Sequence, residues 1–296
     1  MEYRRRRRAS RLPRRANSLW GAVACIVIVV AAVVYLVGIS GAGTWLAEHV
    51  VAPVFQTLGV VGDGGEAQQG EDGADAFTTV ASELLELPAM TCYTLQMGVY
   101  TTESNAEKQS VALQEVGAGG YIVQDGDRYR VLAAGYASQE ELQQVRDQLA
   151  AEGIDSAAYS LTAAPSKLVV TGTGAQVDVL EHTLNGLTEL QSTLCELAIA
   201  FDRDQQSVEE GQGSIAALAS TMEGYLTDVV AVSTDQAVMV SLADCCRDIL
   251  AQLQKAAAMP EDDRAAFTAY LKYTCLFCAE AYCAFCDAVS ALGAAA

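Results

Sequence analysis

The spacing of apolar and polar positions changes several times along the chain and divides it into segments. From Leu19 to Ile39, twenty-one residues carry no charge. At about 1.5 Å of rise per residue, a helix of this length spans the roughly 30 Å hydrocarbon core of a bilayer. Residues 62–75 are rich in glycine, glutamine and acidic side chains without an apolar period, which is typical of a flexible linker. We therefore predict a transmembrane helix at 19–42, and a juxtamembrane segment and linker at 43–90.

Charges on either side of this apolar stretch predict its orientation. Eight arginines precede it, whereas Glu48 is the first charged residue beyond it. By the positive-inside rule, residues 1–18 form a basic cytoplasmic tail and all residues after the helix lie outside the cytoplasm. The alternative is a cleaved signal peptide, for which the small residues at 39–42 would supply a cutting site. The apolar stretch of a signal peptide is usually only about 7–15 residues long, so we favour the anchor.

Residues 91–165 alternate between stretches with a period of two and stretches with a helical period. The expected strands are Tyr93–Tyr100, Tyr121–Gln124, Arg128–Ala134 and Ile154–Leu161. The expected helices begin at the N-caps Ser104 and Ser138, each followed by a glutamate three residues later. The order βαββαβ within about 70 residues predicts a ferredoxin-like layout. In that layout two helices cover one face of an antiparallel sheet, and we expect the other face to be open.

Short motifs in this region follow one another with a characteristic order and spacing. The first expected strand carries the pattern aromatic-x-x-Gln-x-Gly-x-aromatic, in Tyr93, Gln96, Gly98 and Tyr100. The later motifs are Asn105-Ala106, Tyr129-Arg130-Val131 and Ala134-Gly135-Tyr136. Through these motifs, the region resembles the sporulation-related repeat (SPOR) domain. The resemblance implies a peptidoglycan-binding sheet that recognises glycan strands stripped of their stem peptides at sites of cell division.

Strand parity places Gln96 and Arg130 on the open face of the expected sheet, and the resemblance puts both at glycan-contacting positions of the family. An arginine fork can bind a lactyl carboxylate, and a glutamine amide both donates and accepts hydrogen bonds. The candidate glycan-binding residues are Gln96, Tyr100, Tyr121, Arg128 and Arg130. Val99 and Arg128 depart from the family pattern, which more often has a small residue and an aromatic there. The alternative is that Gln96 and Arg130 are ordinary solvated residues.

Beyond a short strand-like piece at 168–170, apolar residues recur every three or four positions to the end of the chain. Val177, Leu180 and Leu184 open the first stripe, and similar stripes occupy 207–231, 234–257 and 262–291. This pattern predicts a C-terminal helical module at 166–296, built as a bundle or an array of helical hairpins. The expected fold class is α+β: one transmembrane helix, a ferredoxin-like βαββαβ domain and a C-terminal all-α bundle.

The last stripe contains two CxxC pairs, a pattern that invites a metal or thiol-redox interpretation. The four residues are Cys275, Cys278, Cys283 and Cys286. On a continuous helix they share one broad face, whereas zinc ribbons place each pair on a turn so that the thiolates converge. We therefore favour core packing of these small apolar side chains and expect no metal and no cofactor. Disulfides with Cys195, Cys245 or Cys246 stay open, because an exported domain can be oxidised.

Charge and composition narrow the function further. The net charge is −19 and the first fifteen residues carry +7, so the rest of the chain carries −26. Such an acidic body does not bind nucleic acid. The two histidines, His49 and His182, are too few for a zinc amidase site, and we expect no enzyme.

The leading hypothesis is a non-catalytic, membrane-anchored peptidoglycan-binding protein of the bacterial envelope, linked to cell division or sporulation. Its helical module would dock an envelope or divisome protein. One alternative is a thiol-redox or metal-binding envelope protein that uses the C-terminal cysteines. The other is a membrane scaffold that does not bind glycan.

Overall fold

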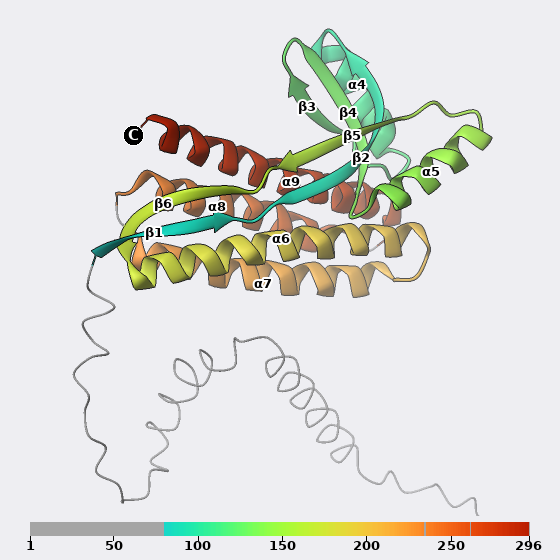
Figure 1. Cartoon of the computed structure of the whole chain (residues 1–296). Helices are drawn as coiled ribbons and strands as arrows, with labels where there is room; N and C mark the ends of the chain where they lie inside the picture. The colour runs from blue at the N-terminus through green and yellow to red at the C-terminus, as the bar shows by residue number, and fades with distance from the viewer. Residues whose placement is uncertain (1–79, 234, 261, 296) are drawn as a thin grey trace, which may run out of the picture. The chain divides into compact units, whose positions relative to one another are not determined.

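The computed structural model describes residues 80–233, 235–260 and 262–295 (Figure 1). The predicted tail at 1–18, the predicted transmembrane helix at 19–42 and most of the predicted linker lie outside these residues. The described elements, in chain order, are β1 (Val80–Leu87), β2 (Met90–Tyr100), α4 (Glu103–Gln114), β3 (Tyr121–Asp125), β4 (Arg128–Tyr136), α5 (Gln139–Ala151), β5 (Ala157–Ala163), β6 (Ser166–Thr173), α6 (Gly174–Asp202), α7 (Val208–Val232), α8 (Ala237–Ala257) and α9 (Arg264–Ala295).

β2 to β5 form a four-stranded sheet whose spatial order is β3-β4-β2-β5, with every neighbouring pair antiparallel. α4 and α5 both pack against β2 and β4. The element order and pairing are those of a ferredoxin-like βαββαβ unit, so the predicted α+β class is confirmed for the described residues. Gly126, with a φ of 59°, closes the tight turn between β3 and β4.

Local capping shifts two of the predicted element boundaries. The N-cap of α4 is Thr102, so Ser104 lies inside the helix instead of capping it. Ser138 does cap α5, because its hydroxyl accepts a hydrogen bond from the Glu141 amide at 3.2 Å. The Ile154 amide donates to the Leu149 carbonyl at 2.9 Å and closes the end of α5. For that reason β5 begins at residue 157 and not at 154.

A two-stranded ribbon continues the β2–β5 pair, which lies at one edge of the sheet. β1 pairs with β6 in antiparallel register, with Leu87 opposite Ser166, just beyond the β2–β5 pairing. The sequence composition assigned 80–87 to the linker, and the structure corrects this. Leu85 and Leu87 alternate inward and are buried in the main core cluster, which gives β1 an apolar face to fold on.

α6 to α9 form the C-terminal helical module, with α9 in contact with the largest variety of elements. α9 packs against α6 and α8, and also against β2, β3, β4, β5 and β6. The helices α6 and α7 each begin with a capping box, at Thr173 and Ser207 respectively. Buried residues of the sheet and of α6 to α9 belong to one continuous apolar cluster. The sheet domain and the helical module therefore share a core.

α9 also changes the accessibility of the sheet. Tyr121 of β3 contacts Tyr273 of α9, with ring centroids 4.9 Å apart. A Cβ atom added to Gly135 of β4 would lie 3.3 Å from the Cys275 sulfur. The sheet face opposite α4 and α5 is thus partly covered by α9, and the expectation of an open face is corrected to that extent. The sequence pattern marks α9 as apolar but does not show which surface it packs against.

Two of the described helices are long and apolar enough to cross a membrane by length and composition alone, namely Val208–Val232 and Arg264–Leu292. The single predicted transmembrane helix is therefore not confirmed. In the apolar window of the second helix, 44% of the residues are buried inside the fold. Burial of α9 against both sheet and helices accounts for its apolar sequence as that of a core helix.

Candidate functional site

Two bulges decide which residues share a face of the sheet. In the pairing of β2 with β4, Ala133 and Met97 are each skipped, so each strand contains one extra residue. Side-chain alternation reverses past a bulge, and these two reversals compensate each other. Val99 pairs with Arg130 after the bulges, and the Gln96 side chain reaches the Arg130 guanidinium. Gln96, Val99 and Arg130 therefore lie on one face, the face that α9 covers further along.

Tyr100 lies on the other face, among the residues under α4. Its ring packs against the small cluster formed by Ala106, Leu113 and Val131. Uninterrupted alternation would put Tyr100 beside Gln96, but the bulge at Met97 reverses the parity between them. Tyr100 was a candidate glycan-binding residue, but its ring lies on the opposite face from Gln96 and supports the packing of α4.

Arg130 is the centre of a polar cluster on the part of the face that α9 leaves accessible. Its Nη1 donates to Oε1 of Gln96 at 2.8 Å, while its Nε and Nη2 lie 2.8 and 2.7 Å from Oδ2 of Asp125. Its guanidinium carbon lies 4.7 Å from the centroid of the Tyr159 ring, in cation–π geometry. Three of the five N–H donors of the guanidinium are thereby engaged, which leaves two for a ligand.

The cluster is held in place but is open to solvent. The Arg130 side chain is 26% exposed, whereas Gln96 is only 9% exposed. Burial, and then the charge of Asp125, raise the pKa of Tyr159. The hydroxyl of Tyr159 therefore keeps its proton in neutral solution and can donate a hydrogen bond. A polyhydroxylated or carboxylated ligand would meet a positioned guanidinium, a phenol and an aromatic edge.

Arg128 extends the cluster toward the tip of the β3–β4 hairpin. It precedes Arg130 by two residues on β4, so that regular alternation places both on the same face. Its side chain is half exposed, and its Nε lies 3.6 Å from Oδ1 of Asp127. An ion pair this exposed is weak and leaves Arg128 available to a ligand.

Tyr121 does not offer its ring to a ligand. Besides its contact with Tyr273, its hydroxyl donates a hydrogen bond to Glu280 of α9. Burial and this carboxylate raise the pKa of Tyr121 far above the ordinary tyrosine value. The prediction of Tyr121 as a glycan-binding residue is therefore corrected, since the residue forms part of the contact between the sheet and α9.

Two members of the cluster were missed by sequence reasoning. Tyr159 lies on β5 opposite Thr94 of β2, and Asp125 ends β3. The alternation of the predicted strand 154–161 offers a signal for Tyr159, but its proximity to Arg130 depends on the order of the strands in the sheet. Asp125 belongs to a sequence that reads as a turn, and its pairing with Arg130 is a consequence of the hairpin register.

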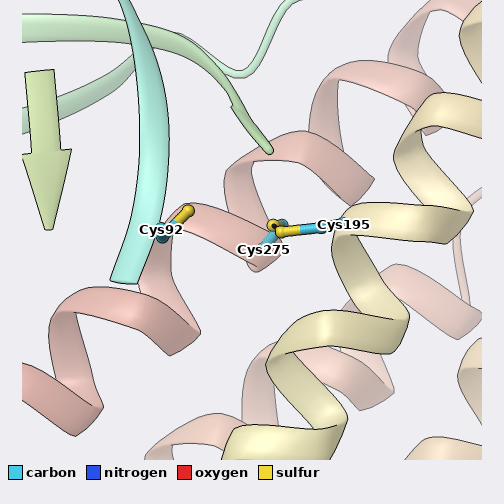
Figure 2. A group of neighbouring side chains, drawn as sticks. All are labelled: Cys92, Cys195 and Cys275. Carbon is cyan, nitrogen blue, oxygen red and sulfur yellow. Dashed lines mark hydrogen bonds between the residues drawn. The ribbon is translucent and has the colours of Figure 1, made fainter. Parts of the chain in front are cut away.

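The cysteines that lie close together in the structure are not the two CxxC pairs. Within the described residues, the group of acids, histidines and cysteines that could hold a metal ion is Cys92, Cys195 and Cys275 (Figure 2). These come from β2, α6 and α9, and the Cys195 and Cys275 sulfurs are 3.3 Å apart. Cys278, Cys283 and Cys286 are not part of this group. Burial raises the pKa of Cys278, as expected for a side chain that serves the core.

Comparison with known proteins gives one positive result. Residues 90–160 match the family model of the SPOR domain. Neither the curated proteins nor the solved structures include a significant match to the chain. The matched residues extend from the start of β2 into β5 and include all the members of the Arg130 cluster.

Proposed function

Because this chain contains a SPOR domain, a non-catalytic module associated with peptidoglycan binding in cell-division proteins, we propose that it is a membrane-anchored, non-catalytic peptidoglycan-binding protein of the bacterial envelope. Its role would be linked to cell division or sporulation. The basic segment at 1–18 and the apolar segment at 19–42 support a single-pass topology with the SPOR domain outside the cytoplasm.

The observation that carries the proposal is the cluster of Gln96, Arg130 and Tyr159 on the accessible part of the sheet face. Its two free guanidinium N–H groups fit the lactyl carboxylate of a muramic acid residue, and Arg128 adds a second cation nearby. Hydroxyls and acetamido groups of the glycan would form hydrogen bonds with the amide of Gln96 and the hydroxyl of Tyr159. No step of this recognition requires a cofactor.

Replacing Arg130 by alanine should weaken binding of the full chain, purified in detergent, to amidase-treated sacculi by about 10–100-fold. A hydrogen bond to a charged group contributes about 1.5–3 kcal/mol, and each 1.4 kcal/mol is a factor of ten in affinity. Arg130→Lys keeps the charge but removes the fork, and should recover only part of the loss. The measurement is a co-sedimentation isotherm.

Lys167→Ala is the matched control, because it removes the same charge from an exposed side chain on β6. Lys167 pairs with Glu86 at 2.6 Å and lies outside the four-stranded sheet. Binding that is equally weak in both variants would reduce the site to a general charge effect. Binding that is unchanged in Arg130→Ala would remove this cluster from the proposal.

A scaffold without glycan binding is the second candidate, and one observation favours it. α9 covers part of the sheet face that the proposal uses, and the Tyr121–Glu280 hydrogen bond ties it there. A long glycan strand could then contact only the end of the face around Arg130. Absence of co-sedimentation by the unaltered chain, with denuded and with intact sacculi, would favour the scaffold.

In dividing cells, a fluorescent fusion of the full chain should concentrate at the septum. The reason is that denuded glycan is what the SPOR resemblance implies as the ligand, and it accumulates where the wall is being split. The Arg130→Ala fusion should spread around the envelope at an unchanged expression level. An even distribution of the unaltered fusion would count against targeting to the division site.

A further inference from the structure

Three cysteines far apart in sequence converge at the junction of the sheet with the helical module. Cys92 of β2, Cys195 of α6 and Cys275 of α9 are all buried, and their sulfur atoms lie within 4.8 Å of one another (Figure 2). In a tetrahedral zinc site with Zn–S bonds of about 2.3 Å, neighbouring sulfurs lie roughly 3.8 Å apart. The Cys195 and Cys275 sulfurs are 3.3 Å apart and no pair exceeds 4.8 Å, so shifts of at most about 1 Å would reach that spacing.

A fourth polar group is directed at the same three sulfurs. Gln191, one turn before Cys195 on α6, is 4% exposed. Its Nε2 lies 3.3 Å from the Cys275 sulfur and 3.5 Å from the Cys195 sulfur. Its Oε1 is buried without a hydrogen-bond partner. An unsatisfied buried carbonyl is costly, and a half-turn of the amide exchanges its oxygen and nitrogen at almost no change in shape.

The space around the trio is restricted by a glycine. A Cβ atom on Gly135 of β4 would lie 2.6 Å from the Cys92 sulfur and 3.3 Å from the Cys275 sulfur. The backbone of β4 thus approaches the thiols more closely than any side chain permits. The three cysteines and Gln191 are all buried, so the site is closed to solvent.

We propose that Cys92, Cys195 and Cys275 bind one Zn²⁺ ion as thiolates, with Oε1 of Gln191 as the fourth ligand. Thiolate sulfur favours zinc over magnesium or calcium, and a four-coordinate site without a free position is structural, not catalytic. Three protons leave the thiols as the ion enters. The ion would fasten β2, α6 and α9 together and hold α9 against the sheet.

A dication at this point would supply the charge that the buried thiols need to ionise, because thiolates, not thiols, bind the metal.

The test uses the full chain purified in detergent under reducing, metal-free conditions. Addition of Zn²⁺ should give about one bound equivalent by mass spectrometry of the metal, and uptake should weaken as the pH falls because protons compete for the thiolates. Co²⁺ in its place should show thiolate-to-metal charge transfer and the strong visible bands of tetrahedral coordination. Gln191→Leu should lower the zinc affinity by about tenfold or more.

Cys275→Ala should abolish this uptake, whereas Cys278→Ala should retain it. Cys278 is the matched control because it is equally buried on α9 but lies outside the trio. Equal zinc content in the two variants would overturn the proposal. So would a Cys195–Cys275 disulfide combined with no zinc uptake after reduction. Should Cys275→Ala fail to fold, the cobalt spectrum of the unaltered chain decides, since octahedral oxygen ligation would overturn the assignment.

Discussion

Replacing Phe267 by alanine should lower the free energy of unfolding of the described fold by about 3–5 kcal/mol, the usual cost of a buried Phe→Ala change. Phe267 lies in the second turn of α9 and is fully buried. Its ring packs against Phe201 of α6 with centroids 5.0 Å apart. A Cβ atom on Gly211 of α7 would lie 3.0 Å from it, so three helices meet at this ring. Alanine would leave a cavity that such a junction cannot fill.

Leu292→Ala provides the comparison for Phe267→Ala within the same helix. Leu292 is 45% exposed, and its loss should change the stability by less than about 1 kcal/mol. Denaturant titration of the full chain in detergent, followed by far-ultraviolet circular dichroism, measures both variants. The contrast tests whether α9 is a core helix. Two equally small effects would mean that α9 is apolar for another reason, such as contact with lipid.

Gly120→Ala should lower the free energy of unfolding by roughly 2–5 kcal/mol. Backbone strain in the left-handed region accounts for about 1–2 kcal/mol of this and overpacking for about 1–3 kcal/mol. Gly120 has a φ of +61° immediately before β3. A Cβ atom there would lie 2.5 Å from the Ser110 carbonyl oxygen. The same backbone region is held by the hydrogen bond from the Ser110 hydroxyl to the Gly120 carbonyl. α4 and β3 therefore cannot separate to make room without losing that contact.

Gly126→Ala separates the two contributions to the Gly120 effect. Gly126 has nearly the same φ, +59°, but nothing lies within 4 Å of its Cβ position. Its substitution should cost only the conformational part, about 1 kcal/mol. Thermal and denaturant unfolding of both variants measure the difference. Similar losses at the two positions would show that the close approach of Ser110 to Gly120 carries no energetic weight.

The local features of the sheet domain followed from sequence because their causes are local. Alternating apolar residues, the Ser138 cap and the Asp-Gly-Asp turn each act within a few residues, and the βαββαβ order emerged from them. Helical stripes located α6 to α9 to within a few residues for the same reason. The position of Gln96 and Arg130 on one face was also predictable in principle, because the two bulges compensate each other in the register of β2 with β4.

The predictions that were wrong share a different cause: the residues concerned make contacts with elements distant in sequence. Tyr100 changed face because of an extra residue that no propensity marks. Tyr121 was buried by a helix that lies more than 140 residues later in the chain. β1 was assigned to a linker because Glu83 and Glu86 interrupt its apolar residues. Its apolar residues Leu85 and Leu87 are buried in the structure, where β1 pairs with β6.

The cysteines show the division between sequence and tertiary structure most sharply. By itself, the sequence determined that the last helix is apolar and that its four cysteines share a broad face. Spacing along one helix cannot bring Cys92 and Cys195 to Cys275, since that convergence requires a strand and two helices to pack together. Only the tertiary structure decided which thiols meet and which part of the sheet stays open, because burial and proximity depend on contacts between elements distant in sequence.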